Sequence, residues 1–98
     1  MASNNEKPLW IPLKTEYFLA FEQGHKKEEY RPLGGRWNEN TCRVGRRVML
    51  GLGYSGRRIF GTVTSFSIER DVDSLDGWRD VYGDNGGPAA AIGIEIDA

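Results

Sequence analysis

The sequence predicts a mainly β, α+β fold, in which several short strands form a small barrel or strongly curved sheet with one or two short helices. Three observations support this prediction. Glycine is abundant, at 13 of 98 residues, and the apolar runs are short, which favours turns and strands over long helices. Apolar and polar residues alternate in several segments, as half-buried strands require. A single short segment carries aromatic residues at helical spacing instead.

The first quarter of the chain reads as a strand followed by a helix. Leu9–Ile11 is predicted to be a short strand that ends at Pro12, because proline cannot donate to a strand ladder. Thr15 can cap a helix that reaches Gln23, and Gly24 is its natural left-handed stop. We assign the apolar stripe of this helix to the core rather than to a ligand site: Tyr17, Phe18 and Phe21.

The middle of the chain predicts three further strands. Glu28–Arg31 reads as a short strand that is broken by the turn residues Pro32–Gly35. Val44–Leu52 and Arg58–Ile68 both contain alternating apolar residues, with the turn Gly53–Gly56 between them. We therefore expect these two strands to pair as an antiparallel hairpin.

The last third is acidic and rich in turns. It predicts one short helix over Leu75–Val81, a loop over Asp84–Pro88, and a final strand in which Ile92, Ile94 and Ile96 alternate. No repeat or internal linker interrupts the pattern. We expect residues 9–98 to form a single domain that follows a flexible N-terminal tail of residues 1–8.

Charge is segregated along the chain although the formal net charge is only −1. Between Arg31 and Arg58 there are seven arginines and one acidic residue, whereas residues 69–98 hold eight acidic residues and two arginines. A near-neutral sum can therefore hide a basic face. Arginine's planar fork suits phosphate and stacks on bases. The alternative is a solvated arginine surface that pairs with the acidic third.

Several classes of site and location are disfavoured. Cys42 is the only cysteine and His25 the only histidine, so no metal-ligand spacing and no internal disulfide is predicted, and we expect no cofactor. No apolar run approaches the roughly 18–20 residues needed to cross a bilayer. The polar start lacks the apolar core of a signal peptide. We expect a cytoplasmic protein without a membrane partner.

A charged segment at the predicted junction of helix and strand is the leading candidate site. Glu29 and Arg31 share one face of the strand, because side chains alternate along it. Lys26 joins that face only if it lies in the turn after Gly24. A lysine kept from water in a cleft can act as a base or nucleophile, but a neighbouring carboxylate favours its charged form. The alternative is a structural ion pair.

The same residues carry a resemblance to a known family. Gly24, Lys26, Glu29 and Arg31 match the pattern Gly-x-Lys-x-x-Glu-x-Arg, so the segment resembles the signature of ASCH domains. The preceding stretch from Ile11 to Phe18 is similar to the opening of these domains, and the strand from Cys42 to Leu50 to their next strand. The resemblance covers roughly residues 11–66. It implies a PUA-like β-barrel with a cleft beside the motif, and RNA or a modified nucleoside or nucleotide as partner.

Two activities are implied by the resemblance. One is amide hydrolysis of N4-acetylcytidine by a lysine, a threonine and a glutamate, and the other is cleavage of single-stranded RNA. Lys26 matches the catalytic lysine, but Glu29 stands where the amidohydrolases carry threonine, so their presumed nucleophile is missing. Glu69 is a candidate for the later glutamate only by its distance along the chain.

Two further groups could contact a nucleic acid. Arg36, Trp37 and Asn38 follow the motif in a loop, where Trp37 could stack on a base and Asn38 could hydrogen-bond its edge. Alternatively, Trp37 plugs the end of the barrel. The second group could hold phosphates at the hairpin tip, or could form a plain exposed turn: Tyr54, Arg57 and Arg58.

Three hypotheses follow from the sequence. The first, which we favour, is an RNA- or nucleotide-binding domain whose cleft is lined by Lys26, Glu29 and Arg31. The second is a hydrolase of single-stranded RNA or of a nucleobase amide, in which Lys26 and Glu29 are the catalytic pair. The third is a non-catalytic module that binds a protein partner through its charged faces.

Overall fold

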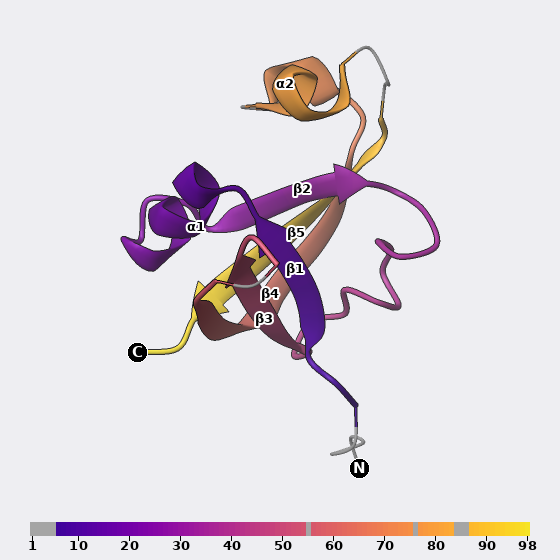
Figure 1. Cartoon of the computed structure of the whole chain (residues 1–98). Coiled ribbons are helices and arrows are strands. Elements are labelled where there is room, and N and C mark those ends of the chain that lie inside the picture. The colour runs from indigo at the N-terminus through magenta and orange to yellow at the C-terminus, as the bar shows by residue number, and fades with distance from the viewer. Residues whose placement is uncertain (1–5, 55, 76, 84–86) are drawn as a thin grey trace.

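The computed structural model describes residues 6–54, 56–75, 77–83 and 87–98. Its elements are strands and short helices in the order β1 (Leu9–Leu13), α1 (Thr15–Glu22), β2 (Glu28–Pro32), β3 (Arg47–Leu52), β4 (Arg58–Glu69), the 3₁₀ helix η1 (Val72–Ser74), α2 (Trp78–Tyr82) and β5 (Ala89–Ile96) (Figure 1). The fold is therefore mainly β with two short α-helices, as the sequence predicts.

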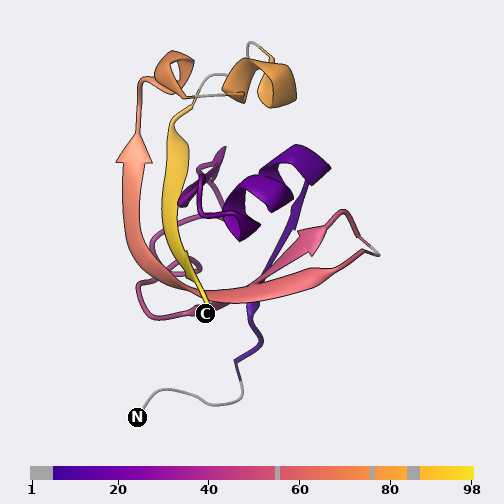
Figure 2. The ribbon, with the colours of Figure 1, turned by 90° about the vertical axis from the view of Figure 1, so that its left-hand side faces the viewer.

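Five strands form one sheet in the order β1-β3-β4-β5-β2. The β1–β3 pair is parallel and the other pairs are antiparallel, which confirms the predicted β3–β4 hairpin. The 12-residue strand β4 bends strongly, and its register shifts between Val63 and Ser65 (Figure 2). A bulge of this kind increases local twist and bend. The sheet consequently curls into a half-barrel with α1 on its concave side.

The main core lies inside the curl. Phe18 and Phe21 of α1 are 0% and 1% exposed, which confirms their assignment to the core. The alternating residues of β3 and β5 supply the opposite side, where Val48, Leu50 and Ile92 are fully buried. Burial of each such side chain contributes roughly 1.5–3 kcal/mol to folding, so this cluster dominates stability.

A second, smaller cluster lies beyond the end of β2, where α2 sits above the sheet (Figures 1 and 2). Its buried members are Val72, Trp78 and Ala89, and Tyr30 and Tyr82 pack against them. The two aromatic residues of α2 are four positions apart and lie on one helical face, with ring centroids 4.4 Å apart. This cluster fastens α2 to β2.

The prediction that Pro12 ends the first strand is wrong, because β1 continues to Leu13 and Pro12 pairs with Gly51. β1 is an edge strand, where proline is tolerated. The Pro12 carbonyl oxygen accepts a hydrogen bond from Arg31, which is not part of β3. The amide and carbonyl of one strand residue point to the same side. The absent N–H of Pro12 would therefore also face away from β3, and no ladder bond is lost.

Three element boundaries also differ from the predictions. Lys14, not Thr15, is the N-cap residue of α1, and it makes no side-chain capping bond. β3 begins at Arg47 rather than Val44, because Gly45 has a positive φ of 95° and Arg46 N–H bonds to the Arg43 carbonyl oxygen in a turn. The predicted helix over 75–81 is instead η1 followed by α2, separated by an extended Leu75.

Some predicted features fall outside the described residues. Positions 1–5 of the predicted tail and positions 84–86 of the predicted loop over Asp84–Pro88 are among them. Within the described ranges, neither α1 nor any other helix has the length and apolar character needed to span a membrane.

Candidate functional site

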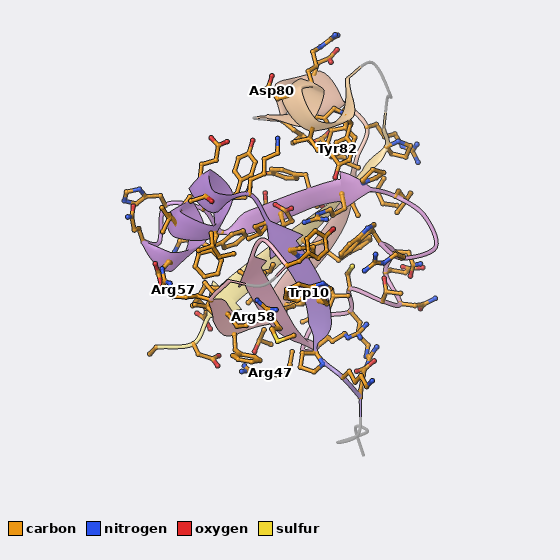
Figure 3. The ribbon with its side chains drawn as sticks, viewed as in Figure 1. Trp10, Arg47, Arg57, Arg58, Asp80 and Tyr82 are labelled. Atoms are coloured by element: carbon orange, nitrogen blue, oxygen red, sulfur yellow. The ribbon has the colours of Figure 1, made fainter. Side chains whose placement is uncertain are left out.

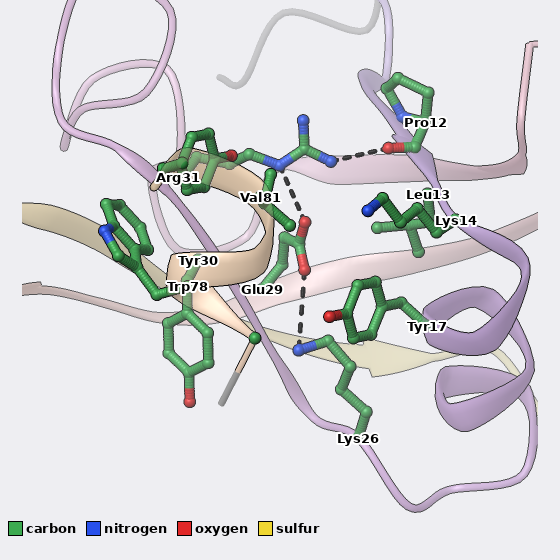
Figure 4. Close-up of a pocket in the computed structure, with 12 residues that line it drawn as sticks. Pro12, Leu13, Lys14, Tyr17, Lys26, Glu29, Tyr30, Arg31, Trp78 and Val81 are labelled. Atoms are coloured by element: carbon green, nitrogen blue, oxygen red, sulfur yellow. Dashed lines mark hydrogen bonds and ion pairs between the residues drawn. The ribbon is translucent and has the colours of Figure 1, made fainter. Parts of the chain in front are cut away.

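A pocket of about 150 Å³ lies where the end of β1, the start of α1, β2 and α2 meet (Figure 4). Its lining combines charged groups with aromatic rings. The charged residues are Lys14, Lys26, Glu29 and Arg31, and the aromatic residues are Tyr17, Tyr30, Trp78 and Tyr82. The Lys26, Glu29 and Arg31 side chains thus converge in one concave site.

Local backbone geometry explains how Lys26 reaches this site. Gly24 adopts a φ of 80° after α1, a conformation that is easy only for glycine. The amides of His25 and Lys26 then both donate to the Ala20 carbonyl oxygen, at 2.8 and 3.1 Å. Lys26 therefore lies in the turn before β2 begins at Glu28, which frees its side chain from strand alternation.

Glu29 is the central group of the site. Its side chain is buried, and its Oε2 accepts a hydrogen bond from Nε of Arg31 at 2.8 Å. Its Oε1 lies 3.7 Å from Nζ of Lys26, which is an ion-pair distance but too long for a strong hydrogen bond. One carboxylate oxygen is therefore fully engaged, while the other can still accept a hydrogen bond from a ligand.

The Lys26 ammonium is surrounded by aromatic faces as well as by Glu29. It lies 5.0, 5.4 and 5.6 Å from the ring centroids of Tyr30, Tyr17 and Phe21. Aromatic faces and a carboxylate both attract a positive charge. Lys26 is therefore suited to hold an anionic or carbonyl oxygen as a cation, more than to attack it as a neutral amine.

Arg31 is held by three contacts at once. Besides its bond to Glu29, its Nη2 donates to the Pro12 carbonyl oxygen at 2.7 Å, and its guanidinium lies 5.0 Å from the Trp37 ring centroid. Within the described part of the chain, its Nη1 donates no hydrogen bond. The guanidinium is therefore fixed in orientation with donors left over.

The aromatic walls carry neutral phenols. The Tyr30 hydroxyl donates to Oε1 of Glu28 at 2.8 Å. Burial, and then this bond, raise the pKa of Tyr30 from 10.0 to about 12. Burial likewise raises the pKa of Tyr82. Both rings thus keep their protons over the whole physiological range and offer faces for stacking.

The loop residues predicted to bind nucleic acid do not line the pocket. Trp37 is only 9% exposed and belongs to the main core. Its role as a base-stacking platform stays a prediction, and its burial disfavours that role. Arg36 lies over the same ring, at 5.2 Å. The Asn38 side chain organises the loop, donating to the Gly34 carbonyl oxygen at 2.9 Å and accepting from the Thr41 amide at 3.1 Å.

The predicted phosphate contacts at the β3–β4 turn also lie outside the pocket (Figure 3). Arg57 pairs with Glu22, its Nη2 donating to Oε1 at 2.9 Å, and this bond lowers the pKa of Glu22. Arg58 lies 4.5 Å from the Trp10 ring centroid and donates to the Tyr54 carbonyl oxygen. Tyr54 is 79% exposed.

Much of the arginine-rich third is neutralised by acids elsewhere in the chain. Arg43 pairs with Glu6, and Arg47 donates to Asp97. Asp97 is one of the acidic residues of the last third of the chain. The alternative interpretation, in which the arginine surface pairs with that acidic third, therefore holds for Arg47. The basic face that the sequence indicates between Arg31 and Arg58 is therefore less positive than its number of arginines suggests.

Several lining residues escape prediction from the sequence. Tyr17 is predicted to belong to the core, and no pattern in the sequence marks Trp78 as a site residue, yet both line the pocket. The four-residue spacing of Trp78 and Tyr82 signals a shared helical face but not what that face covers. Among the described residues, no three His, Cys, Asp or Glu side chains gather as a metal site would require.

No protein-family model matches the chain, and no curated protein matches its sequence.

Proposed function

We propose that this chain is an ASCH-like domain of PUA-like fold that binds one nucleobase, as part of RNA or of a modified nucleoside, in the pocket between α1, β2 and α2. The observation that carries the proposal is a buried Glu29 carboxylate, oriented by Arg31 and flanked by Lys26, between aromatic walls. The resemblance of residues 24–31 to the ASCH signature supports it.

The chemistry of the pocket suits the edge of a base. Oε1 of Glu29 can accept a hydrogen bond from an amino or ring N–H group, and the Lys26 ammonium beside it can donate to a carbonyl oxygen. The rings of Tyr17, Tyr30 and Tyr82 line the pocket and are only half-buried, so they offer surface that a planar ring can contact. At about 150 Å³ the pocket is smaller than a typical drug site and fits one base with its sugar outside.

Hydrolysis of RNA or of a nucleobase amide is the second candidate. The observation that favours it is the proximity of Lys26 and Glu29, at 3.7 Å, inside a pocket. Oε1 of Glu29 could take a proton from a water that attacks the carbonyl carbon or the phosphorus, and the Lys26 ammonium could stabilise the negative oxygen that develops there. As the bond to the leaving amine or oxygen breaks, Glu29 could return the proton to that leaving group. Because Arg31 engages Oε2, Oε1 is the oxygen that is left for proton transfer.

The test is a panel of nucleosides, modified nucleosides and short single-stranded RNAs, each measured for binding and for turnover. Lys26→Ala and Glu29→Gln should each weaken binding by about tenfold or more, the effect of losing one hydrogen bond to a charged group. Lys27→Ala is the matched control, because this neighbouring lysine does not line the pocket. Full affinity in both pocket variants would overturn the proposal.

The panel also separates the candidates. Pocket binding of one base should depend weakly on salt, whereas binding along several phosphates falls steeply. Turnover that is lost in Lys26→Ala while binding persists would establish the hydrolase. If nothing on the panel binds, the protein-interaction module becomes the better explanation.

A further inference from the structure

The described lining of the pocket has an excess of positive charge. Lys14, Lys26 and Arg31 line it together with a single carboxylate, that of Glu29. Arg31 forms a close pair with Glu29, at 2.8 Å, and so offsets its charge. The charges of two ammonium groups are then not offset by a close partner. One is that of Lys26, 3.7 Å from Oε1 of Glu29, and the other is that of Lys14 at the opening of the pocket. A small pocket with this balance attracts an anion.

Lys14 is placed to act on a ligand at the opening. It lies at the junction of β1 and α1, where its backbone caps the helix, and its side chain is exposed. No ion pair or hydrogen bond engages its ammonium within the described residues. Figure 4 shows the side chain directed over the pocket toward Glu29 and Arg31. The Lys14 side chain thus differs from those of Arg47 and Arg57, which form ion pairs with acidic residues.

Arg31 supplies the second half of an anion site. Its Nε and Nη2 are bound to Glu29 and Pro12, which leaves the Nη1 donors free and fixed in direction. A pre-oriented guanidinium loses little side-chain entropy when it binds an oxyanion. Nη1 can therefore donate a charge-assisted hydrogen bond to a phosphate oxygen while Nε and Nη2 keep their present partners.

We infer that the ligand carries a terminal phosphate, which Lys14 and Arg31 hold at the mouth of the pocket while the base lies between the aromatic walls. This inference rests on the proposed function and narrows it to nucleotides. A terminal phosphate carries a charge of about −1.5 to −2 with three acceptor oxygens. It therefore matches two cations better than an internal phosphodiester, which carries a single charge and must continue the strand on both sides.

The test compares matched ligands by calorimetry: each nucleoside that binds, its 5′- and 3′-monophosphates, inorganic phosphate, and a short RNA with and without a terminal phosphate. In the wild-type protein, one monophosphate of a pair should bind about tenfold or more tightly than the nucleoside, the effect of one charge-assisted hydrogen bond. Lys14→Gln should remove most of this ratio. Lys27→Gln should preserve it, because Lys27 does not line the pocket.

Equal affinity for nucleosides and monophosphates would overturn this inference and leave the proposed function standing. An unchanged ratio in Lys14→Gln would also overturn it. Failure of every nucleoside and nucleotide to bind would instead remove the proposed function, and the inference with it. A larger gain for the phosphorylated RNA than for the mononucleotide would support the inference and identify an RNA end as the source of the phosphate.

Discussion

Arg31 donates a hydrogen bond from Nη2 to the Pro12 carbonyl oxygen at 2.7 Å, and this bond joins the two edge strands of the sheet. β1 and β2 lie at opposite ends of the strand order, so the bond spans the open side of the half-barrel. The same guanidinium orients Glu29. One side chain therefore closes the fold and organises the candidate site.

Arg31→Ala should lower the free energy of unfolding by about 2–3 kcal/mol, because it leaves the buried Glu29 carboxylate without its hydrogen-bond donor. Arg36→Ala is the control, since Arg36 lies over the same Trp37 ring but forms no ion pair among the described residues. It should cost under about 1 kcal/mol. Urea denaturation measures both.

Adding Glu29→Gln to the Arg31→Ala protein should recover part of the lost stability, because the uncompensated charge is then gone. Equal urea midpoints for Arg31→Ala and Arg36→Ala would contradict the bridging role of Arg31.

Gly77→Ala should destabilise the protein and displace α2. Gly77 has a φ of 79°, and a Cβ there would lie 2.3 Å from the Tyr17 hydroxyl oxygen. Gly24→Ala is the control, with a φ of 80° and open space around the new Cβ. It should cost about 1–2 kcal/mol from backbone conformation alone, and Gly77→Ala should cost about 1–3 kcal/mol more from the clash.

Removing the hydroxyl with Tyr17→Phe should restore part of the stability of the Gly77→Ala protein, since the nearest remaining ring atom is 3.3 Å from the new Cβ. No restoration in thermal unfolding would show that Tyr17 does not limit the approach of α2.

Stability should fall as the pH rises from about 10 to about 12. The folded protein holds the Tyr30 proton until its raised pKa of about 12, whereas the unfolded chain loses it near 10.0. The stabilisation is therefore complete below pH 10 and is lost as the pH passes the folded pKa. Urea midpoints across this range measure the loss, and phenolate absorbance follows the titration.

The Tyr30→Phe protein should lack both the absorbance step near pH 12 and this part of the pH dependence. A wild-type protein whose tyrosines all ionise together near pH 10 would disprove the assignment to Tyr30.

Trp37→Ala should cost about 3–5 kcal/mol of stability, as truncation of a large core aromatic does. Tyr54→Ala is the comparison, because both residues are predicted from the sequence to contact a ligand, yet Tyr54 is 79% exposed. Its removal should change stability by under about 0.5 kcal/mol. Similar unfolding curves for the two variants would place Trp37 outside the core.

Local signals in the sequence were sufficient for much of the fold. The glycine stop of α1, the hairpin of β3 and β4, and the meeting of Lys26 with Glu29 all depend on short-range backbone rules, and these predictions agree with the structure. The end of the first strand was mispredicted at Pro12, because its tolerance depends on β1 being an edge, which is a property of the whole sheet.

The rest of the site could not be derived from spacing. Trp37, which lies between Arg36 and Asn38, looks the same in the sequence whether its ring is exposed for stacking or buried at the end of the barrel. The contribution of α2 depends on long-range packing of Trp78 against Ala89 and Tyr30, which no local pattern encodes. Lys14 gains its place only because β1 and α1 meet beside β2.

The division of the apolar interior into two clusters has a consequence for how this protein can diverge. One wall of the pocket, formed by Trp78 and Tyr82, belongs to the minor cluster, while the principal fold is held by the other. Substitutions at Val81 or Tyr82 can therefore reshape what the cavity accepts while the main cluster keeps the half-barrel together. The residues that select a ligand and the residues that stabilise the fold thus belong largely to different clusters of one small chain.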